Sequence, residues 1–392
     1  MRICVVAYTF YEYDNRVRRY ADTLAKRGDE VEVIALRHRD RPSVQVMNGV
    51  RVFQIQRREI NERWRLTYLF RLALFFVRAM ALLTKRHLQN RYDLFHIHSV
   101  PDFLVFTAWF PKLMGAKVIL DIHDLLPELY ASKFRTTCES PIGKFLIAVE
   151  RASAAFADHV IVANHIWQQK LLSRSIKDYR KCTAILNFPD PSIFCRHELK
   201  KSGRKFVFMY PGTLSYHQGV DVAIRAFALI KNDVPNAEFH IYGEGSQKGF
   251  LTGLIAELGL EDRVFLKELL PLTEIAAVME HADIGVVPKR KDSFGNEAFS
   301  TKILEFMAVG VPVIVADTEI DKYYFDESLV TFFQSEDQKH LADRMLLLIQ
   351  DGKLRRRLVS TAEDFIKKNN WEVKKAEYLN LVDECLISTG SP

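Results

Sequence analysis

A short run of polar residues between 297 and 305 could bind a ligand that carries both phosphate and sugar. The start of a helix offers unpaired backbone N–H groups and a partial positive charge, so a hydroxyl pair and an ammonium at such a start could hold a pyrophosphate. A carboxylate accepts hydrogen bonds from two adjacent hydroxyls, which a ribose or a hexose provides. One ligand with ribose, pyrophosphate and sugar could form hydrogen bonds or ion pairs with every polar side chain of this run. These side chains belong to Glu297, Ser300, Thr301, Lys302 and Glu305.

The surrounding sequence predicts a helix that positions these groups. The pair Ser300-Thr301 is typical of a helix start, and Gly310-Val311-Pro312 ends the helix before an apolar strand. Glu297 then lies in the loop before the helix, and Glu305 lies further along it. A structural interpretation stays open, because the helix dipole favours a carboxylate near a helix start and Glu305 could be solvated. Lys302 could likewise pair with a neighbour.

Two histidines stand at the ends of apolar runs in the first half of the chain. The runs 93–99 and 117–124 are strand-like, and they end in His98-Ser99 and His123-Asp124. In open α/β sheets ligands bind outside the carboxyl ends of parallel strands, so we expect His98 and His123 to point into one crevice. A structural role is the alternative, and a metal site would need further ligands that the sequence does not supply.

Two arginines are further candidates for the site, Arg290 at the pyrophosphate and Arg16 facing the cleft. Arg290 follows the strand-like run 283–288, and we assign it to the pyrophosphate together with Lys302. Arg16 lies on the first turn of the first predicted helix, beside two other arginines. Solvated surface is the alternative for both, because basic residues on a loop or a first turn are often simply exposed.

Composition favours a cytoplasmic protein of two domains. The chain has 392 residues, 48% of them hydrophobic, which suffices for two cores of ordinary size. Its net charge of +6 is modest, which argues against a nucleic-acid binder but permits contact with an anionic membrane. The five cysteines lack metal-ligand spacing, and a strand-like run directly follows Met1-Arg2, so no leader is expected.

Strand-like and helical segments alternate twice along the chain. The first unit is strand, helix, strand, with Asp14 or Asn15 as the helix N-cap and Gly28 as its end. A polar run over 197–205 is typical of a linker. We therefore expect three parts: a first Rossmann-like domain at 1–196, a second at 205–369, and a terminal segment at 370–392.

The segment from Asn61 to Asn90 is long and apolar. It approaches the length of a membrane span, but Arg71, Arg78 and Lys85 interrupt it along one helix face, and arginine near a bilayer centre is costly. We expect a core helix rather than a transmembrane one. The helix could also lie on an anionic membrane surface, with these flanking residues at the headgroups: Arg57, Arg58, Arg63, Trp64 and Arg65.

The stretch from Glu297 to Val313 resembles the carboxy-terminal signature of the retaining, nucleotide-sugar-dependent glycosyltransferases of the GT-B fold (group 1, or family 4, type). In that family a Glu-x7-Glu motif precedes a Met-Ala-x-Gly-x-Pro-Val run, which begins here at Met307. The stretch Asp121 to Glu128 is similar to the family's His-Asp segment, and the resemblance covers nearly the whole chain. It implies an α/β architecture of two Rossmann-like domains that face a central cleft, with a C-terminal helix crossing back to the first domain.

The resemblance also implies a reaction, in which a hexosyl group moves from a nucleoside diphosphate sugar to a glycan or lipid-linked saccharide with retention at the anomeric centre. Such transfer serves cell-surface polysaccharide or lipopolysaccharide synthesis. His123 and Glu297 would be catalytic, close to the transferred hexose, and Glu305 would bind the ribose. No metal, other cofactor or nucleic acid is implied. Further substrate contacts are implied for Gly212, Thr213, Gly243, Leu270 and Asp124, although apolar packing accounts equally well for Leu270.

The loop between Gly212 and Gly219 departs from the family pattern. Relatives often place an arginine after the first glycine and a lysine before the second, both aimed at the donor phosphates, whereas Thr213 and Gln218 stand there in this chain. The two cations assigned above would have to supply the charge. The departure keeps open a catalytically silent partner subunit. The fold also serves non-hydrolysing nucleotide-sugar epimerases, which need no acceptor and yield a changed sugar nucleotide.

Overall fold

The computed structural model describes residues 1–38, 41–58, 65–197 and 205–387. The chain divides into two compact units, and each is an α/β domain built on a mostly parallel sheet. The first unit holds Met1–Tyr130, Thr136–Asn187 and the residues from Lys375 on, and the second holds Ala131–Arg135 and Phe188–Lys374. The predicted pair of Rossmann-like domains is thereby confirmed.

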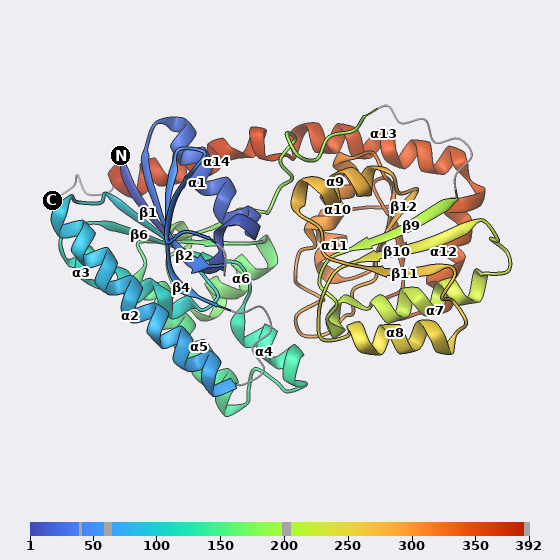
Figure 1. The fold of residues 1–392 in the computed structure, drawn as a ribbon, viewed down its shortest axis with the longest axis horizontal. Helices are drawn as coiled ribbons and strands as arrows, with labels where there is room; N and C mark the ends of the chain where they lie inside the picture. The colour runs from blue at the N-terminus through green and yellow to red at the C-terminus, as the bar shows by residue number, and fades with distance from the viewer. Residues whose placement is uncertain (39–40, 59–64, 198–204, 388–392) are drawn as a thin grey trace. The chain divides into compact units, whose positions relative to one another are not determined.

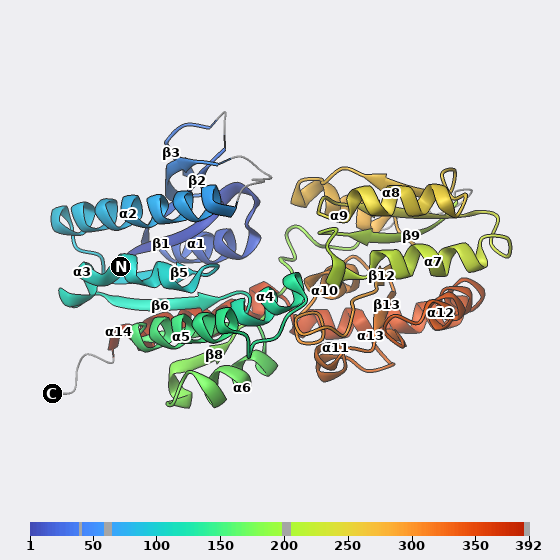
Figure 2. The ribbon, with the colours of Figure 1, turned by 90° about the horizontal axis from the view of Figure 1, so that it is seen from below.

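The first sheet has eight strands in the order β3-β4-β2-β1-β5-β6-β7-β8. Neighbouring strands are parallel except β3, which pairs antiparallel with β4 at the outer edge of the sheet (Figure 2). The strand order reverses between β1 and β5, and the carboxyl ends at such a switch point form a ligand-binding crevice in open α/β sheets. The strands are β1 (Arg2–Phe10), β2 (Glu30–Arg37), β3 (Val44–Met47), β4 (Val50–Arg57), β5 (Leu94–His98), β6 (Lys117–Ile122), β7 (His159–Val162) and β8 (Cys182–Ala184).

Helices cover both faces of this sheet (Figure 1). Helices α1 and α14 lie on one face, where Tyr20 packs on Tyr378 with ring centroids 4.3 Å apart, and α2, α3 and α5 lie on the other. The helices and 3₁₀ turns of this part are η1 (Tyr11–Tyr13), α1 (Asn15–Arg27), α2 (Arg65–Gln89), η2 (Asp102–Ala108), α3 (Trp109–Leu113), α4 (Leu126–Phe134), α5 (Pro141–Phe156), α6 (His165–Arg174), η3 (Tyr179–Lys181) and α14 (Trp371–Ile387).

The predicted ends of α1 are confirmed. The Asp14 carboxylate accepts a hydrogen bond from the Val17 backbone N–H at 3.1 Å, which is the expected N-cap interaction. Gly28 ends the helix with φ of 99°, a backbone conformation that favours glycine. Local sequence alone therefore sets both ends of this helix.

Helix α2 packs one apolar stripe onto the first sheet. Leu72, Phe75, Ala79 and Leu83 are buried at helical spacing, as expected for a core helix. By length and composition alone, the segment Thr67–Gln89 could also cross a membrane. Within the apolar 18-residue stretch of this segment, 22% is buried in the structure. Its opposite face exposes further apolar side chains. Of the flanking residues expected at a membrane, 63 and 64 lie outside the described chain.

The second sheet has six parallel strands in the order β11-β10-β9-β12-β13-β14. Its order reverses between β9 and β12, so the crevice expected in a Rossmann-type sheet lies at the carboxyl ends of these two strands. The strands are β9 (Phe206–Pro211), β10 (Ala237–Tyr242), β11 (Val264–Lys267), β12 (Ile284–Val287), β13 (Val313–Ala316) and β14 (Thr331–Phe333).

The helices of the second domain enclose this sheet. Helices α7 and α8 lie together along one face, and α9 and α10 along the other (Figure 1). One core joins α7, α8 and α12 to the strands, with Phe208, Phe227 and Phe239 fully buried in it. The elements are η4 (Tyr216–Gln218), α7 (Val220–Ile230), α8 (Lys248–Glu257), α9 (Leu272–Glu280), α10 (Thr301–Ala308), α11 (Glu319–Tyr324), α12 (Gln338–Gln350) and α13 (Gly352–Lys368).

The boundary between the units falls earlier than the position that we expected. Residues 188–197 group with the second unit, because His197 Nδ1 lies 2.9 Å from a Glu280 carboxylate oxygen and Pro189 accepts a hydrogen bond from the Trp371 backbone. Such contacts join segments far apart in sequence, so local polarity does not reveal them. Most of the expected linker, 198–204, lies outside the described residues.

Candidate functional site

The carboxyl end of β9 brings Gly212, Gly243 and Lys302 together. A Cβ atom on Gly243 would collide with the Gly212 carbonyl, and one on Gly212 would collide with the Lys302 side chain. Gly212 also has φ of 134°, which L side chains rarely adopt. These glycines therefore let two loops and a lysine approach one another at the switch point of the second sheet.

Lys302 lies half-buried on the first turn of α10. Its Nζ is 3.5 Å from the Gln218 side-chain oxygen and 5.4 Å from the centre of the Tyr210 ring. Burial lowers the pKa of Lys302 to about 8, against the opposing effect of the Glu305 carboxylate. Glu305 is half-buried on the same helix. The site thus holds a cation that is poorly solvated and that an anionic ligand would stabilise.

Ser300 caps α10 at its N-terminus without the usual side-chain hydrogen bond. Its hydroxyl is buried, and within the described part of the chain it has no hydrogen-bond partner. Thr301, the first residue of the helix, is half-buried beside it. An unpaired buried hydroxyl at the N-terminus of a helix whose first turn also carries a lysine matches the chemistry of a phosphate-binding position.

The predicted site residues of the neighbouring loops lie as follows. Thr213 is exposed, and its carbonyl accepts a hydrogen bond from the Tyr210 hydroxyl at 2.9 Å. The Gly243 N–H donates to the Lys267 carbonyl at 3.1 Å, which ties the β10 loop to β11. Leu270 is half-buried in the loop after β11, so its side chain is placed for packing, and its backbone lies on a loop at the carboxyl edge of the sheet.

The loop that carries Glu297 is held by a buried ion pair. Lys289 Nζ donates to the Ala298 carbonyl at 2.7 Å and lies 2.9 Å from the Asp321 carboxylate. Both side chains are fully buried, so burial lowers the pKa of Lys289 and raises that of Asp321. Glu297 itself is half-buried, and its N–H donates to the Phe294 carbonyl at 3.1 Å.

Lys289 and Asp321 are functional residues that the sequence did not indicate. The sequence signal for this pair is slight. Lys289 lies two residues after the buried strand β12, and Asp321 lies on the short helix α11. Nothing local indicates that the two meet. The Asn296 side chain also holds this loop, because its amide oxygen accepts a hydrogen bond from the Glu319 backbone N–H at 3.0 Å.

The structure corrects the assignment of Arg290 to the pyrophosphate. Its guanidinium donates to both Asp221 carboxylate oxygens at 3.0 and 2.7 Å and to Glu336 at 3.0 Å. It also lies 4.1 Å from the centre of the Tyr216 ring. Arg290 is buried, so it is neither a solvated loop residue nor a cation open to a phosphate. It joins the start of α7 to the loop after β14.

In the first domain the structure brings His98 and His123 together at the ends of β5 and β6. His98 Nδ1 lies 2.8 Å from His123 Nε2, and the Asp121 carboxylate lies 3.2 Å from the former and 3.4 Å from the latter. The His123 side chain is 20% exposed, whereas that of His98 is 1% exposed. Only His123 can therefore contact a ligand directly, which corrects the expectation that both face the crevice.

Arg16 is also a correction. Its guanidinium donates to both oxygens of Asp121 at 2.8 Å and to the Ile185 carbonyl at 3.0 Å, and the side chain is buried. It is thus neither solvated helix surface nor a ligand contact. Burial alone would raise the pKa of Asp121, but the charge of Arg16, together with His123 and the hydrogen bonds from His123 and His96, outweighs burial and holds that pKa well below the ordinary value.

Asp124 follows His123 and is half-buried. Burial raises the pKa of its carboxyl above the ordinary value, against the opposing charges of His123 and Arg16. The carboxyl therefore sits in a poorly solvated position, one residue after His123 in the chain. A sugar hydroxyl could donate to it there.

One buried group has the composition of a metal site: His96, His98 and Asp121. Its geometry fits a metal poorly. The two imidazoles are stacked, with ring centroids 4.2 Å apart and an interplanar angle of 26°, and Arg16 takes both Asp121 oxygens. Stacked rings cannot both direct in-plane nitrogen lone pairs at one ion between them, so this group is better described as a hydrogen-bonded network.

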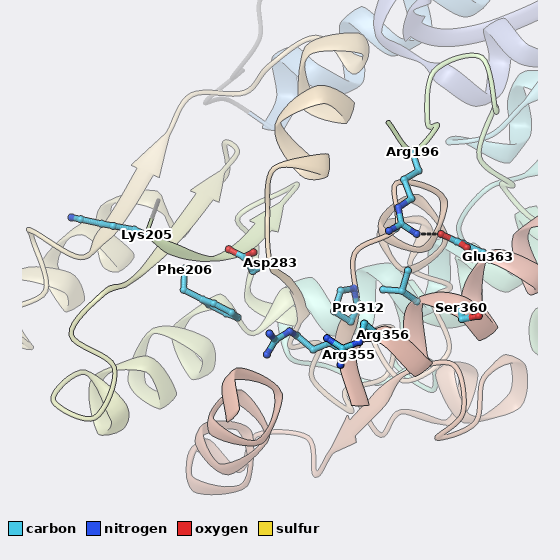
Figure 3. A pocket seen from close by; sticks show the side chains of 11 residues that line it. Arg196, Lys205, Phe206, Asp283, Pro312, Arg355, Arg356, Ser360 and Glu363 are labelled. Carbon is cyan, nitrogen blue, oxygen red and sulfur yellow. Dashed lines mark hydrogen bonds and ion pairs between the residues drawn. The ribbon is translucent and has the colours of Figure 1, made fainter. Parts of the chain in front are cut away.

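A cavity of about 490 Å³ lies at the opposite edge of the second sheet (Figure 3). Its wall includes Phe206, Asp283 and Pro312, at the amino ends of β9, β12 and β13. Arg355, Arg356 and Ser360 reach it from α13, and an Arg196–Glu363 ion pair closes one side (Figure 3). The cavity contains none of the predicted site residues, and ligands of such sheets bind at the carboxyl ends of the strands.

Two family models match the chain. The model described as Glycosyl transferases group 1 matches residues 194–365, and that described as Glycosyl transferase 4-like domain matches residues 13–183. An uncharacterised glycosyltransferase of Methanocaldococcus jannaschii is 23% identical over 407 residues, which cover 96% of this chain and 97% of that protein. The gap between the two matches, at residues 184–193, includes the boundary in the sequence between the two compact units, after Asn187.

Solved structures share the fold over the whole chain. Sucrose-phosphate synthase from Thermosynechococcus elongatus has a TM-score of 0.81 at 18% identity and covers 99% of both chains. The Anabaena protein HepE in complex with UDP and glucose has a TM-score of 0.73 at 16% identity, over 98% of this chain and 100% of that one. The chain therefore belongs to the group 1 glycosyltransferases, and its fold is GT-B.

Proposed function

We propose that this glycosyltransferase is a retaining hexosyltransferase that uses a nucleoside diphosphate sugar as donor. The observation that carries the proposal is the N-terminus of α10 at the switch point of the second sheet, where the Lys302 side chain lies against Gly212, Gly212 lies against Gly243, and the cap residue Ser300 has a buried hydroxyl without a partner among the described residues. Cation, hydroxyl and helix N-terminus together suit a diphosphate. The HepE complex with UDP and glucose, a protein of the same fold, supports a donor of this kind.

In the proposed reaction the bond between the anomeric carbon and the phosphate oxygen breaks while the acceptor oxygen bonds to the same face, and the proton of the acceptor hydroxyl passes to the leaving phosphate oxygen. Lys302 and the α10 N-terminus stabilise the charge that develops on the leaving diphosphate. Glu305 binds the ribose hydroxyls and Glu297 the donor hexose, and His123 contacts the reacting sugar. Retaining glycosidases use one carboxylate as a nucleophile, but we do not give that role to Glu297. No step requires a metal.

Calorimetric binding of UDP, GDP and ADP tests this proposal. One diphosphate should bind with micromolar affinity, and Lys302→Ala and Glu305→Ala should each weaken it by about tenfold or more, which is ~1.4 kcal/mol. Lys353→Ala and Glu257→Ala change exposed residues of the same two types on α13 and α8, so they should bind as the unchanged protein does.

Two outcomes would count against the proposed donor site. If no diphosphate binds, or if the α10 variants bind as tightly as their controls, then α10 is not the phosphate site and a catalytically silent subunit becomes the better hypothesis. An incubation without acceptor that yields a changed sugar nucleotide would indicate an epimerase instead. Transfer to an acceptor with inversion at the anomeric carbon would refute the retaining mechanism but not the donor site.

We further propose that the acceptor is a lipid-linked saccharide and that the enzyme works at the cytoplasmic face of an anionic membrane. The exposed face of α2 carries Leu69, Phe70 and Val77 together with the cations Arg78 and Lys85. Apolar side chains beside basic ones suit a helix that lies in the headgroup region. The cysteines among the described residues form no disulfide, which suits a reducing compartment.

Flotation with lipid vesicles tests the membrane proposal. The protein should bind vesicles that contain phosphatidylglycerol and should not bind vesicles of phosphatidylcholine alone, and raised salt should weaken binding. Replacing Phe70 and Val77 by Ser should abolish the association. Replacing the exposed Leu229 and Phe250 of α7 and α8 in the same way is the control and should not. If the α2 variant and the control variant bind the vesicles equally, α2 is not the membrane-binding helix.

A further inference from the structure

Three polar atoms meet behind the exposed edge of His123: His98 Nδ1, His123 Nε2 and an oxygen of Asp121. The two nitrogens are 2.8 Å apart, and the carboxylate oxygen lies 3.2 Å from His98 Nδ1 and 3.4 Å from His123 Nε2. At 2.8 Å one of the two imidazoles donates a hydrogen and the other accepts it. Which one donates decides what His123 presents to a ligand.

The surroundings of His98 decide the direction. Burial lowers its pKa well below the ordinary value, and the neighbouring His96 adds to this, so His98 is neutral and carries one N–H. Its Nε2 is buried and has no hydrogen-bond partner within the described chain. An N–H at Nε2 would stay unpaired there, which is costly in a buried position. The proton of His98 therefore belongs on Nδ1.

The charge of Asp121 supports the same direction. Arg16 binds both oxygens of this carboxylate and keeps it ionised. An ionised oxygen 3.2 Å from His98 Nδ1 attracts an N–H at that nitrogen and repels a lone pair. The same oxygen lies 3.4 Å from His123 Nε2, where the proposed arrangement places a lone pair, so the charge favours an N–H on His98 Nδ1 only through the shorter distance. The unpaired buried proton is therefore the main cost of the opposite arrangement.

We propose that His98 is a positioning residue that fixes His123 in the tautomer protonated at Nδ1. His123 Nε2 accepts the hydrogen of His98, so the proton of a neutral His123 lies on Nδ1, because the partner of one ring nitrogen sets the state of the other. His123 then offers a donor, not an acceptor, at its exposed edge. If the proposed function holds, this donor serves an oxygen of the transferred sugar.

Nitrogen NMR of the protein labelled with ¹⁵N-histidine tests the tautomer without any substrate. In the unchanged protein, the long-range couplings of His123 should show protonation at Nδ1. His98→Phe keeps a ring but removes the donor, so His123 should turn to protonation at Nε2 and donate to Asp121. His98→Asn places an amide N–H near the position of Nδ1 and should preserve the original tautomer.

Matched measurements separate this inference from the proposed function. His159→Gln changes a half-buried histidine that bonds to Thr183, and it should leave the His123 signals unchanged. Sugar transfer should lose about tenfold in kcat/KM with His98→Phe and recover with His98→Asn, while diphosphate binding stays constant because His123 would contact only the sugar.

Protonation of His123 at Nε2 in the unchanged protein would overturn the inference, and this holds even if His98→Phe fails to fold. An unaltered tautomer in a folded His98→Phe protein would overturn it as well. The expected tautomers with unaltered transfer would instead count against the role of His123 in catalysis.

Discussion

The place of Lys302 in the fold changes the pKa of its ammonium group. It sits against the Tyr210 ring and Gln218, and burial brings its pKa to about 8. The family resemblance implies that relatives often place an arginine and a lysine in the loop after the first strand of this domain, where this chain has Thr213 and Gln218. In our proposal one half-buried lysine on α10 replaces that charge, and its protonation then governs donor binding.

Diphosphate binding should therefore weaken with alkaline pH. A folded-state pKa that burial has lowered to about 8 means that Lys302 is mostly protonated at pH 7 and mostly neutral at pH 9. Only the protonated form attracts a phosphate, so Kd should rise about tenfold over this interval, and binding near pH 8 should take up protons. Calorimetry in buffers of different ionisation enthalpy measures both quantities.

Lys302→Met is the control for this pH dependence. It should bind weakly at every pH and show no proton uptake. A Kd that stays level between pH 7 and 9 in the unchanged protein would mean that Lys302 does not contact the phosphate.

At the scale of elements, the loop between β12 and α10 depends on a clamp from outside its own sequence. Lys289 holds the Ala298 carbonyl, Asp321 of α11 neutralises Lys289, and the Asn296 side chain binds the start of α11. Short loops without such contacts sample many conformations. The clamp therefore gives Glu297 a defined place next to the Ser300 cap.

Replacing Lys289 by Met should destabilise the second domain by about 3–5 kcal/mol, because it leaves the Asp321 carboxylate buried without its partner. Urea denaturation measures this change in the free energy of unfolding. The double variant Lys289→Met, Asp321→Leu should recover most of the stability, since both charges are gone.

Donor binding separates the clamp from stability. The double variant should still bind the nucleoside diphosphate, through α10, but bind the complete sugar nucleotide less tightly, because the Ala298 carbonyl is released and Glu297 is no longer held. Equal losses for both ligands would show that the pair serves stability alone.

At the scale of the whole molecule, the first domain is built from both ends of the chain. Tyr378 on α14 is buried against Tyr20, and its hydroxyl lies 2.9 Å from His96 Nδ1. Asp383 of the same helix pairs with Arg27 at 2.8 Å. The network behind His123 thus rests partly on residues near the C-terminus.

Tyr378→Ala should lower the stability of the first domain by about 3–5 kcal/mol, as large aromatic truncations in cores do. Tyr378→Phe, which loses only the hydroxyl, should cost about 1 kcal/mol. Hydrogen–deuterium exchange should then quicken in β1 and α1 of the Ala variant and stay unchanged in β9 and β10. Faster exchange throughout both domains would contradict a local role.

Sequence alone determined the features that depend on neighbouring residues. The alternation of apolar strands and amphipathic helices predicted two α/β domains, and caps such as Asp14, Gly28 and Ser300 marked helix ends that the structure places at the same residues. The resemblance in the Glu-x7-Glu stretch identified the family. These signals are local because a cap, a turn or a periodic face is set by residues a few positions apart.

Only the tertiary structure decided which charged side chains are available to a ligand. We expected Arg16 at the cleft or on the solvated surface, and Arg290 at the pyrophosphate or on a solvated loop. Each is instead buried against a carboxylate, 105 positions away for Asp121 and 69 for Asp221. His98 proved to lie behind His123, and Lys289 proved to hold the Glu297 loop. A buried charge must find its partner across the folded chain, and one sequence does not record which distant carboxylate that is.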